Sequence, residues 1–450
     1  MNFDQLRAST IASFLTQLLF EEAYSPSRVL LLGPSITMVY ALSIWFTYAL
    51  SHEFGWISSI PQVLFPPLAI QLAAVAAAWK TVVDNNQVDP DMIYRYNVFF
   101  WILSIHQLYH LRQSLVVGIP TSKIPYYGGK HLKGQTILVT GANAGIGKET
   151  VYQLSCMGAR RIVLLCRSEK KGKQAEWDIR MKLSTQPPYE HGNDTELIVC
   201  QCDLSDFVSI RTAVHHIKTN KKIETVDVII NNAGLVMGTH SKSKDGYELM
   251  MQANYLGHFL LTQLLIQEKL LNPEISDGDD PSSRPPRVIN LTSSTFKLVG
   301  KEGFDFDDMF CEKGRKYTMF GQYSQTKLAN VLYTKELSRR YPKLLAYAVH
   351  PGIVRTNVTS NMSWYLRVPN AIFSWYIAAM QKTPTQGAYS SVYCAAAFVD
   401  NLPPSGSLVH NCHHHADDAA TTPASESIPD AKRLWEVSEH LTGLNFKKTN

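Results

Sequence analysis

Short apolar runs alternate with longer mixed stretches between residues 131 and 446. Five runs are rich in Val, Ile and Leu and have the length of buried strands: 135–140, 161–166, 196–202, 226–230 and 287–293. Helical stretches separate these runs. Strands that alternate with helices pair most economically as one parallel sheet with helices on both faces. The pattern therefore predicts an α/β fold with a doubly wound parallel sheet.

Ahead of this domain the hydrophobic pattern changes. Residues 29–51 and 54–79 contain no charged side chain, and each stretch exceeds the ~20 apolar residues that cross a bilayer core as a helix. Pro34 lies early in the first stretch, and three prolines interrupt the second. Two crossings, one kinked span and a re-entrant hairpin all fit this pattern.

The chain thus divides into three regions. We expect residues 1–130 to form a helical membrane-anchoring segment, residues 131–446 to form the α/β domain, and residues 447–450 to form a tail. Lys and Arg flank the two apolar stretches but do not occur in the connection between them. Both flanks are therefore expected on the cytosolic side. The expected location is the endoplasmic reticulum membrane, with the α/β domain facing the cytosol.

Composition narrows the function classes. The net charge of +5 is too small and too dispersed for a nucleic-acid surface, so no nucleic-acid partner is expected. The seven cysteines show no metal-ligand spacing. No metal site is expected, and the thiols suit a reducing compartment. The oligomeric state stays open, with a homodimer as one option.

A glycine-rich turn follows the first predicted strand and precedes a helix predicted over residues 148–157. Strand, glycine turn and helix are the setting of a dinucleotide fingerprint, in which the backbone approaches a pyrophosphate at the helix N-terminus. Glycines also serve ordinary turns, but the strands that follow at βα spacing favour the nucleotide site. The turn residues expected to contact the cofactor are Gly141, Asn143, Gly145, Ile146 and Gly147.

A basic residue ends the second predicted strand. Arg167 stands where enzymes that prefer NAD(H) usually carry an acidic residue for the ribose hydroxyls. A guanidinium at this position would pair with a 2′-phosphate, so NADP(H) is favoured over NAD(H). The lysines that follow are explained equally well by a solvated helix start.

Small and polar residues end the later strands. The carboxyl ends of parallel strands share one edge of the sheet, so these residues are predicted to line one cleft. The fifth run ends in the hydroxyls of Thr292 and Ser293 at that same edge, and Ser294 follows. The other residues expected at the cofactor are Asp203, Leu204, Asn231, Ala233 and Gly234.

Tyr323 and Lys327 lie four residues apart in a predicted helix, and this spacing places them on one face. A phenol ordinarily titrates near ~10. A neighbouring ammonium would lower that pKa, so the tyrosine would serve as an acid or base near neutral pH. A solvent-facing pair on a surface helix shows the same spacing, so the accompanying motifs decide between the two interpretations.

Taken in order, these motifs resemble the short-chain dehydrogenase/reductase family, whose fold is Rossmann-like. The matching positions are the Thr140–Gly147 turn, Asn231–Gly234, Asn254, the serine pair and Tyr323-x-x-x-Lys327. The segments 251–262 and 350–356 narrow the resemblance to the branch that contains retinol dehydrogenases. That branch also contains the X-linked dehydrogenase/reductase, which is similar towards the C-terminus too.

The resemblance implies roles for four catalytic residues. Tyr323 would be the general acid/base, with its pKa lowered by Lys327, which also binds the nicotinamide ribose. Ser293 would hydrogen-bond the substrate oxygen, and Asn254 would hold a water of the proton relay. Ser294 rivals Ser293, because three hydroxyl residues occur in succession.

The resemblance also assigns cofactor contacts. Asp203 would contact the adenine, and the backbone at Pro351, Gly352 and Thr356 would cover the nicotinamide. The distance from the serine pair to the tyrosine is longer than is usual in the family. We therefore expect residues 295–320 to form an inserted loop at the active site.

The leading hypothesis is a membrane-anchored oxidoreductase that transfers a hydride between NADP(H) and a lipophilic alcohol or carbonyl. Retinol-like, polyprenol-like and sterol substrates all suit an enzyme that draws its substrate from the bilayer. A carbonyl reductase of small soluble substrates fits the same catalytic residues. A non-catalytic nucleotide-binding membrane scaffold is the third hypothesis, and the complete proton relay argues against it.

Overall fold

The computed structural model describes residues 132–185, 195–219, 221, 223–274, 284–354, 381–414 and 421–444. The predicted membrane spans at 29–51 and 54–79 and the tail at 447–450 lie outside these residues. Within the described part of the chain, none of the helices has an apolar stretch long enough to traverse a bilayer.

Eight strands form one sheet in the described residues. They are β1 (Thr136–Thr140), β2 (Arg161–Cys166), β3 (Glu196–Gln201), β4 (Val228–Asn231), β5 (Arg287–Leu291), β6 (Leu345–His350), β7 (Leu408–His410) and β8 (His413–His414). Their order is β3-β2-β1-β4-β5-β6-β7-β8, with β1 to β7 parallel and β8 antiparallel to β7. The predicted parallel, Rossmann-like sheet is confirmed, and its strand order reverses beside β1.

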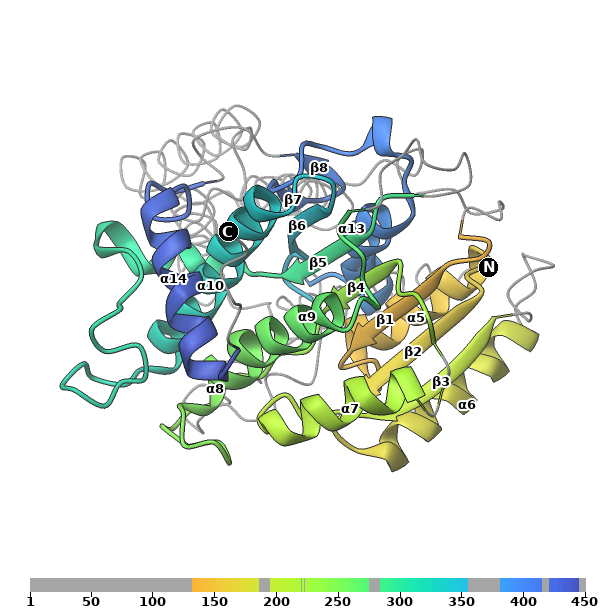
Figure 1. Ribbon diagram of the computed structural model, residues 1–450, viewed down its shortest axis with the longest axis horizontal. Coiled ribbons are helices and arrows are strands. Elements are labelled where there is room, and N and C mark those ends of the chain that lie inside the picture. The colour runs from red at the N-terminus through yellow and green to blue at the C-terminus, as the bar shows by residue number, and fades with distance from the viewer. Residues whose placement is uncertain are drawn as a thin grey trace, which may run out of the picture. The chain divides into compact units, whose positions relative to one another are not determined.

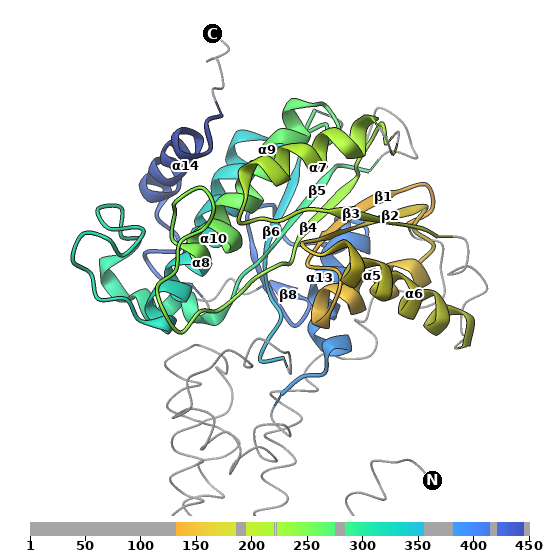
Figure 2. The same cartoon turned by 90° about the horizontal axis from the view of Figure 1, so that it is seen from below.

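Helices cover both faces of the sheet (Figure 1). On one face lie α7 (Phe207–Thr219), α9 (Gly257–Gln267) and α10 (Met319–Arg340), and on the other lie α5 (Gly145–Cys156), α6 (Glu169–Thr185) and α13 (Pro384–Ala396) (Figure 2). Side chains of each strand alternate between the two cores: Leu138 packs on the α7 side, and Ile137 and Val139 pack on the α5 side. Both strand faces are buried, which explains the nearly continuous apolar runs in the sequence.

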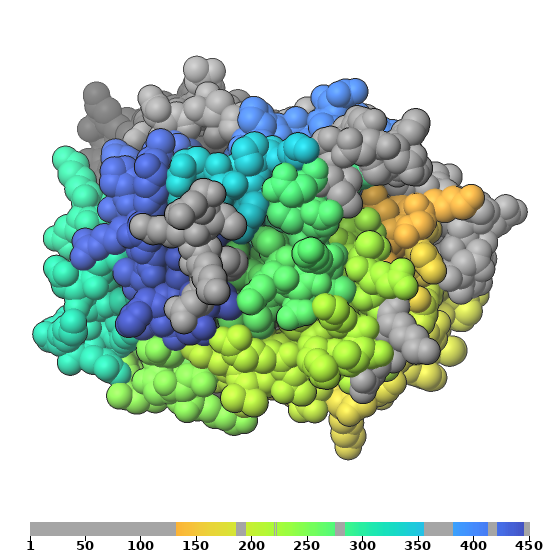
Figure 3. Space-filling view, in the orientation of Figure 1, coloured from red at the N-terminus to blue at the C-terminus, as the bar shows by residue number. Residues whose placement is uncertain are grey.

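The last described helix, α14 (Ile428–Thr442), packs against α10. Its Trp435 is buried and meets Phe259 of α9 edge to face, with ring centroids 5.2 Å apart. Figure 3 shows α14, in deep blue, beside the turquoise segment that precedes α10. Arg433 of α14 lies over the ring of Phe306 in that segment, 4.3 Å from the centroid.

The segment predicted as an insertion, residues 295–320, forms the 3₁₀ helix η5 (Ser294–Glu302) and a loop that leads into α10. Within the loop, Arg315 ion-pairs with Asp305 at 2.9 Å. The amide of Arg315 also donates to the carboxylate of Asp308. These contacts give the loop a defined path to the start of α10.

A π-helical turn interrupts the helix that leads into α9. Glu248 caps α8 (Leu249–Met251), and the π-helix η4 (Gln252–Leu256) follows. Gly257 begins α9 directly against the loop after β3, where a Cβ atom would lie 2.4 Å from the carbonyl oxygen of Leu204. Single π-turns inside α-helices are frequent at functional sites.

We expect Gly257→Ala to destabilise the domain by about 1–3 kcal/mol, because the added methyl group would displace the Leu204 backbone. Equilibrium unfolding of detergent-solubilised protein measures this change. Lys171→Ala on the exposed face of α6 is the control, expected to stay within about 0.5 kcal/mol of the wild type. Equal stability of the two variants would contradict the close contact at Gly257.

Candidate active site

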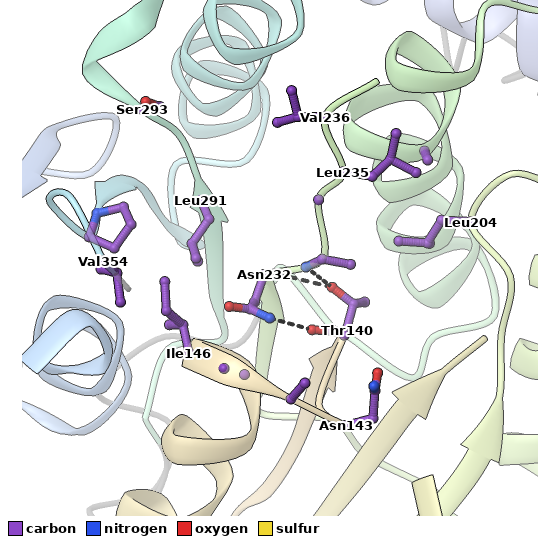
Figure 4. Close-up of a pocket in the computed structure, with 18 of the residues that line it drawn as sticks. Thr140, Asn143, Ile146, Leu204, Asn232, Leu235, Val236, Leu291, Ser293 and Val354 are labelled. Atoms are coloured by element: carbon purple, nitrogen blue, oxygen red, sulfur yellow. Dashed lines mark hydrogen bonds between the residues drawn. The ribbon is translucent and has the colours of Figure 1, made fainter. Parts of the chain in front are cut away.

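A cavity of about 730 Å³ opens at the carboxyl ends of the strands, around the point where the strand order reverses (Figure 4). Fifteen of the residues predicted at the site line it. They are Gly141, Asn143, Gly145, Ile146, Gly147, Arg167, Asp203, Leu204, Ala233, Gly234, Ser293, Tyr323, Lys327, Pro351 and Gly352. Asn231 and Asn254 lie behind the wall of the cavity, and Thr356 is outside the described residues.

The glycine turn leaves no room for side chains. Gly141 adopts a φ of +64°, which side-chain-bearing residues rarely adopt. A Cβ atom at Gly147 would lie 2.5 Å from both the Gly141 carbonyl oxygen and the Asn232 side chain. The turn therefore packs directly against the loop after β4.

The N-terminus of α5 is suited to a phosphate group. Ala144 is its N-cap, and among the described residues no side chain caps the helix and no acidic residue occupies its first turn. Free amides at a helix N-terminus, together with the helix dipole, favour an anion. The turn thus fits the pyrophosphate of a dinucleotide.

One hydroxyl connects β1 to the loop after β4. Thr140 Oγ1 accepts hydrogen bonds from the amides of Asn232 and Ala233, each at 2.9 Å. The Asn232 side chain in turn donates to the Thr140 carbonyl oxygen at 2.8 Å (Figure 4). Thr140 and Asn232 belong to the matched motifs but were given no site contact, because only the pairing of β1 with β4 brings them together.

Arg167 and Asp203 lie in the part of the cavity formed by the loops after β2 and β3. Arg167 is exposed, and its carbonyl oxygen accepts from the Gln201 side chain at 3.2 Å. The Asp203 carboxylate accepts from the amide and hydroxyl of Ser205 at 3.0 and 2.6 Å. Asp203 is therefore held in place by the start of its own loop.

Tyr323 and Lys327 both extend from α10 into the cavity, as their spacing predicted. The Lys327 ammonium lies 5.4 Å from the centre of the Tyr323 ring and donates to the Leu291 carbonyl oxygen at 3.0 Å. Gly234 adjoins this pair, since a Cβ atom there would lie 3.7 Å from Lys327 Nζ. The structure thus brings the pair together with the end of β5 and the loop after β4.

The pKa of Tyr323 does not shift in the direction that the sequence predicted. Burial raises the pKa of Tyr323 to about 12, and a hydrogen bond with Ser293 opposes this shift. Burial also lowers the pKa of Lys327 to about 8. The Tyr323 pKa is therefore raised where the sequence predicted a lowered value, because desolvation of the phenol outweighs the hydrogen bond with Ser293.

The two candidate serines have different environments. Ser293 lines the cavity, hydrogen-bonds with Tyr323 and caps η5 by accepting from the Thr295 amide at 3.3 Å. Ser294 is buried away from the cavity. The geometry therefore places Ser293, and not Ser294, beside the tyrosine.

Asn254 lies in the π-helical turn and is fully buried. Its Oδ1 accepts from the Leu235 amide at 2.8 Å, while its Nδ2 donates to the Leu235 carbonyl at 2.9 Å and to Thr326 Oγ1 at 3.3 Å. Thr326 belongs to α10, the helix that also carries Tyr323 and Lys327. The side chain thus fixes the loop after β4 against α10.

Asn231 is also buried and does not reach the cavity. Its side chain donates to Asn290 at 2.8 Å and to Thr262 at 3.1 Å, which links β4 to β5 and α9. Asn231 therefore connects neighbouring strands and does not reach the cavity, where the sequence predicted that it would contact the cofactor.

The loop after β6 closes another side of the cavity. Pro351 and Gly352 line it, and a Cβ atom at Gly352 would lie 2.9 Å from the amine of Lys382. Lys382 also donates from its backbone to Ile353 at 2.7 Å. His350, which the sequence reasoning did not select, lines the cavity next to this loop.

Known proteins are similar to this chain in sequence. The family model described as short chain dehydrogenase matches residues 135–295. Retinol dehydrogenase 12 from Homo sapiens is 35% identical over 319 residues, which cover 70% of this chain and 89% of that protein. Retinol dehydrogenase 11 from Homo sapiens is 36% identical over 337 residues, which cover 74% of this chain and 92% of that protein.

The chain belongs to the short-chain dehydrogenase/reductase family. A solved structure of an uncharacterized protein from Mycobacterium paratuberculosis is also similar, with 26% identity and a TM-score of 0.50 over 70% of this chain and 96% of that chain. As a short-chain dehydrogenase, the protein is an NAD(P)-dependent oxidoreductase that acts on CH–OH groups. The predicted family is confirmed.

The buried amine of this dehydrogenase has a measurable consequence for stability. The unfolded chain binds more protons than the folded one between pH 8 and 10.5, because the Lys327 pKa falls from 10.5 to about 8 on folding. Stability from this group therefore rises with pH across that window, and the full penalty for the buried ammonium applies below it.

We expect Lys327→Met to raise the free energy of unfolding at pH 7 by at most roughly 3 kcal/mol, and by less at pH 10. Guanidinium titrations in detergent at the two pH values measure the difference. Lys133→Met, at an exposed lysine before β1, should show no such pH dependence. A variant no more stable than the wild type at pH 7 would contradict the buried charge.

Proposed function

We propose that this dehydrogenase transfers a hydride between NADP(H) and a lipophilic alcohol or its carbonyl. The observation that carries the proposal is the meeting of Ser293, Tyr323 and Lys327 at the end of a cavity that begins at the glycine turn. When bound, NADP(H) supplies or accepts the hydride. The protein has then to orient the substrate oxygen and move one proton.

Two hydroxyl groups act on the substrate oxygen. Ser293 donates a hydrogen bond that orients it, and Tyr323 is the general acid or base. With a pKa of about 12, Tyr323 is protonated near neutral pH, so it can donate to a carbonyl oxygen as the negative charge develops there. Lys327 places a positive charge beside the phenolate that this donation leaves, and it binds the nicotinamide ribose.

A relay replaces the proton that Tyr323 gives up. The Asn254 side chain already has hydrogen-bond partners at both its oxygen and its nitrogen. Its main-chain carbonyl is therefore the group we assign to holding the relay water. Asp203 would hold the adenine end of the dinucleotide, and the loop at Pro351 and Gly352 would hold the nicotinamide end.

The character of the cavity wall supports a lipophilic substrate. Val236, Leu291 and Val354 line the cavity around Ser293 (Figure 4). The relatives named as retinol dehydrogenases point to a retinoid, and polyprenol-like and sterol substrates share its chemistry. Residues 1–130 would anchor the enzyme in the endoplasmic reticulum membrane with its catalytic domain in the cytosol, and a homodimer is compatible with this arrangement.

The preference for NADP(H) depends on Arg167. Arg167 lines the cavity directly after β2. The adenosine ribose of a dinucleotide bound at the switch point would lie beside it. A 2′-phosphate there would gain a charge-assisted hydrogen bond from it.

Replacement of the phenol tests the catalytic assignment. We expect Tyr323→Phe to lower kcat by about 100-fold or more, because Tyr323 is the group proposed to donate the proton. The measurement is NADPH oxidation by solubilised protein with retinaldehyde, a polyprenal and a sterol ketone. Tyr341→Phe, the same substitution at the far end of α10, should turn over like the wild type. Unchanged turnover in Tyr323→Phe would refute the assignment.

Reversal of the charge at Arg167 tests the cofactor preference. We expect Arg167→Glu to raise the KM for NADPH by about 10-fold or more, since one lost ionic hydrogen bond is worth roughly that factor. The KM for NADH should change much less. Lys133→Glu, before the amino end of β1 and away from the cavity, controls for the change in net charge. An equal rise for both cofactors would contradict the proposed contact with a 2′-phosphate.

A further inference from the structure

His258 lies in the first turn of α9, and only 2% of its surface is exposed. Both ring nitrogens have polar neighbours. Nε2 lies 2.9 Å from Thr140 Oγ1 at the end of β1, and Nδ1 lies 3.1 Å from the main-chain oxygen of Asn254. The imidazole thus joins the strand that leads into the glycine turn to the π-helical turn.

A count of hydrogen-bond donors locates the ring proton. Thr140 Oγ1 already accepts from the amides of Asn232 and Ala233, and a hydroxyl oxygen has two lone pairs. It must therefore donate its own proton, and His258 Nε2 at 2.9 Å is a better acceptor than the Ile230 carbonyl at 3.4 Å. Nε2 is then the acceptor, so Nδ1 carries the proton and donates to the carbonyl of the π-helical turn.

That carbonyl is the group assigned above to the relay water. A carbonyl oxygen has two lone pairs, so it can accept from His258 and also from a water. The hydrogen bond from His258 fixes the direction of the Asn254 peptide from the side of β1. The side chain of Asn254 fixes the same residue from the side of α10, through Thr326.

We propose that His258 is a positioning residue, whose neutral imidazole aligns the Asn254 carbonyl for proton transfer and ties it to Thr140 at the start of the glycine turn. This inference rests on the proposed function, because it gives a purpose to the relay of that same site. His258 touches neither the cavity nor the reacting atoms.

The imidazole is unsuited to carry the proton itself. Burial lowers the pKa of His258 to about 3, and the positive charge of Lys327 from α10 adds to this effect. The ring is therefore neutral throughout the working range of pH. Its contribution is geometric, through the direction of two hydrogen bonds.

Two substitutions separate the two hydrogen bonds. The amide nitrogen of asparagine occupies the position of histidine Nδ1, and the amide of glutamine reaches the position of Nε2. His258→Asn can keep the donor to Asn254 and loses the contact with Thr140, while His258→Gln does the reverse. His215→Gln, on the exposed face of α7, is the control and should behave like the wild type.

We expect opposite kinetic effects in the full-length protein, assayed with NADPH and retinaldehyde. His258→Gln should lower kcat by about 10- to 100-fold with little change in the KM for NADPH, because a misdirected relay group slows the proton-transfer step. His258→Asn should retain more of kcat but raise the KM for NADPH. Similar losses in both variants, or a lower kcat in His258→Asn, would overturn the proposal.

A second measurement does not depend on turnover. Nitrogen chemical shifts of labelled histidine distinguish the two neutral tautomers and the imidazolium, and comparison with His258→Gln assigns the signal. A neutral Nδ1–H tautomer at pH 7 supports the inference, while an Nε2–H tautomer or an imidazolium overturns it. If the wild type fails to oxidise NADPH with any substrate, the proposed function fails, and the tautomer still decides the geometry.

Discussion

The cleft exists because β1 and β4 lie side by side while the chain leaves them in different directions. The Thr140 hydroxyl holds this junction by accepting from two successive amides after β4. That contact brings the Asn232 side chain so close to the glycine turn that Gly147 has no space for a Cβ atom. The loop that adjoins Tyr323 and Lys327 and the glycine turn are thereby fixed to one another.

Tyr323 and Lys327 lie in a buried environment that opposes the ionisation of both side chains. Burial shifts the pKa of Tyr323 upwards and that of Lys327 downwards, so each group prefers its neutral form more than it would in water. The fold sustains this arrangement through buried polar contacts behind it, such as the chain from Asn231 through Asn290 to Thr334. The buried ammonium of Lys327 therefore costs stability, which the two large hydrophobic cores supply.

Local pattern was sufficient for much of the fold and part of the site. Apolar runs predicted the parallel strands, because a strand buried on both faces must be apolar nearly throughout. The spacing of Tyr323 and Lys327 predicted a shared face, since helical geometry fixes it. The run Thr292–Ser294 left Ser293 and Ser294 as alternatives, because a pattern of hydroxyls does not tell which one turns towards the cavity. In the structure β5 ends at Leu291, and Ser293 caps the 3₁₀ helix that follows.

The sequence by itself determined which chemical groups are present and how they are spaced along each element. Tertiary structure decided which of them meet and how strongly water is excluded around them. The Tyr323 pKa moved opposite to expectation because desolvation depends on every neighbour in space, and spacing along a helix carries no record of it. The buried roles of Asn231, Asn254 and His258 were hidden for the same reason: their partners lie on strands and helices that are distant in the chain.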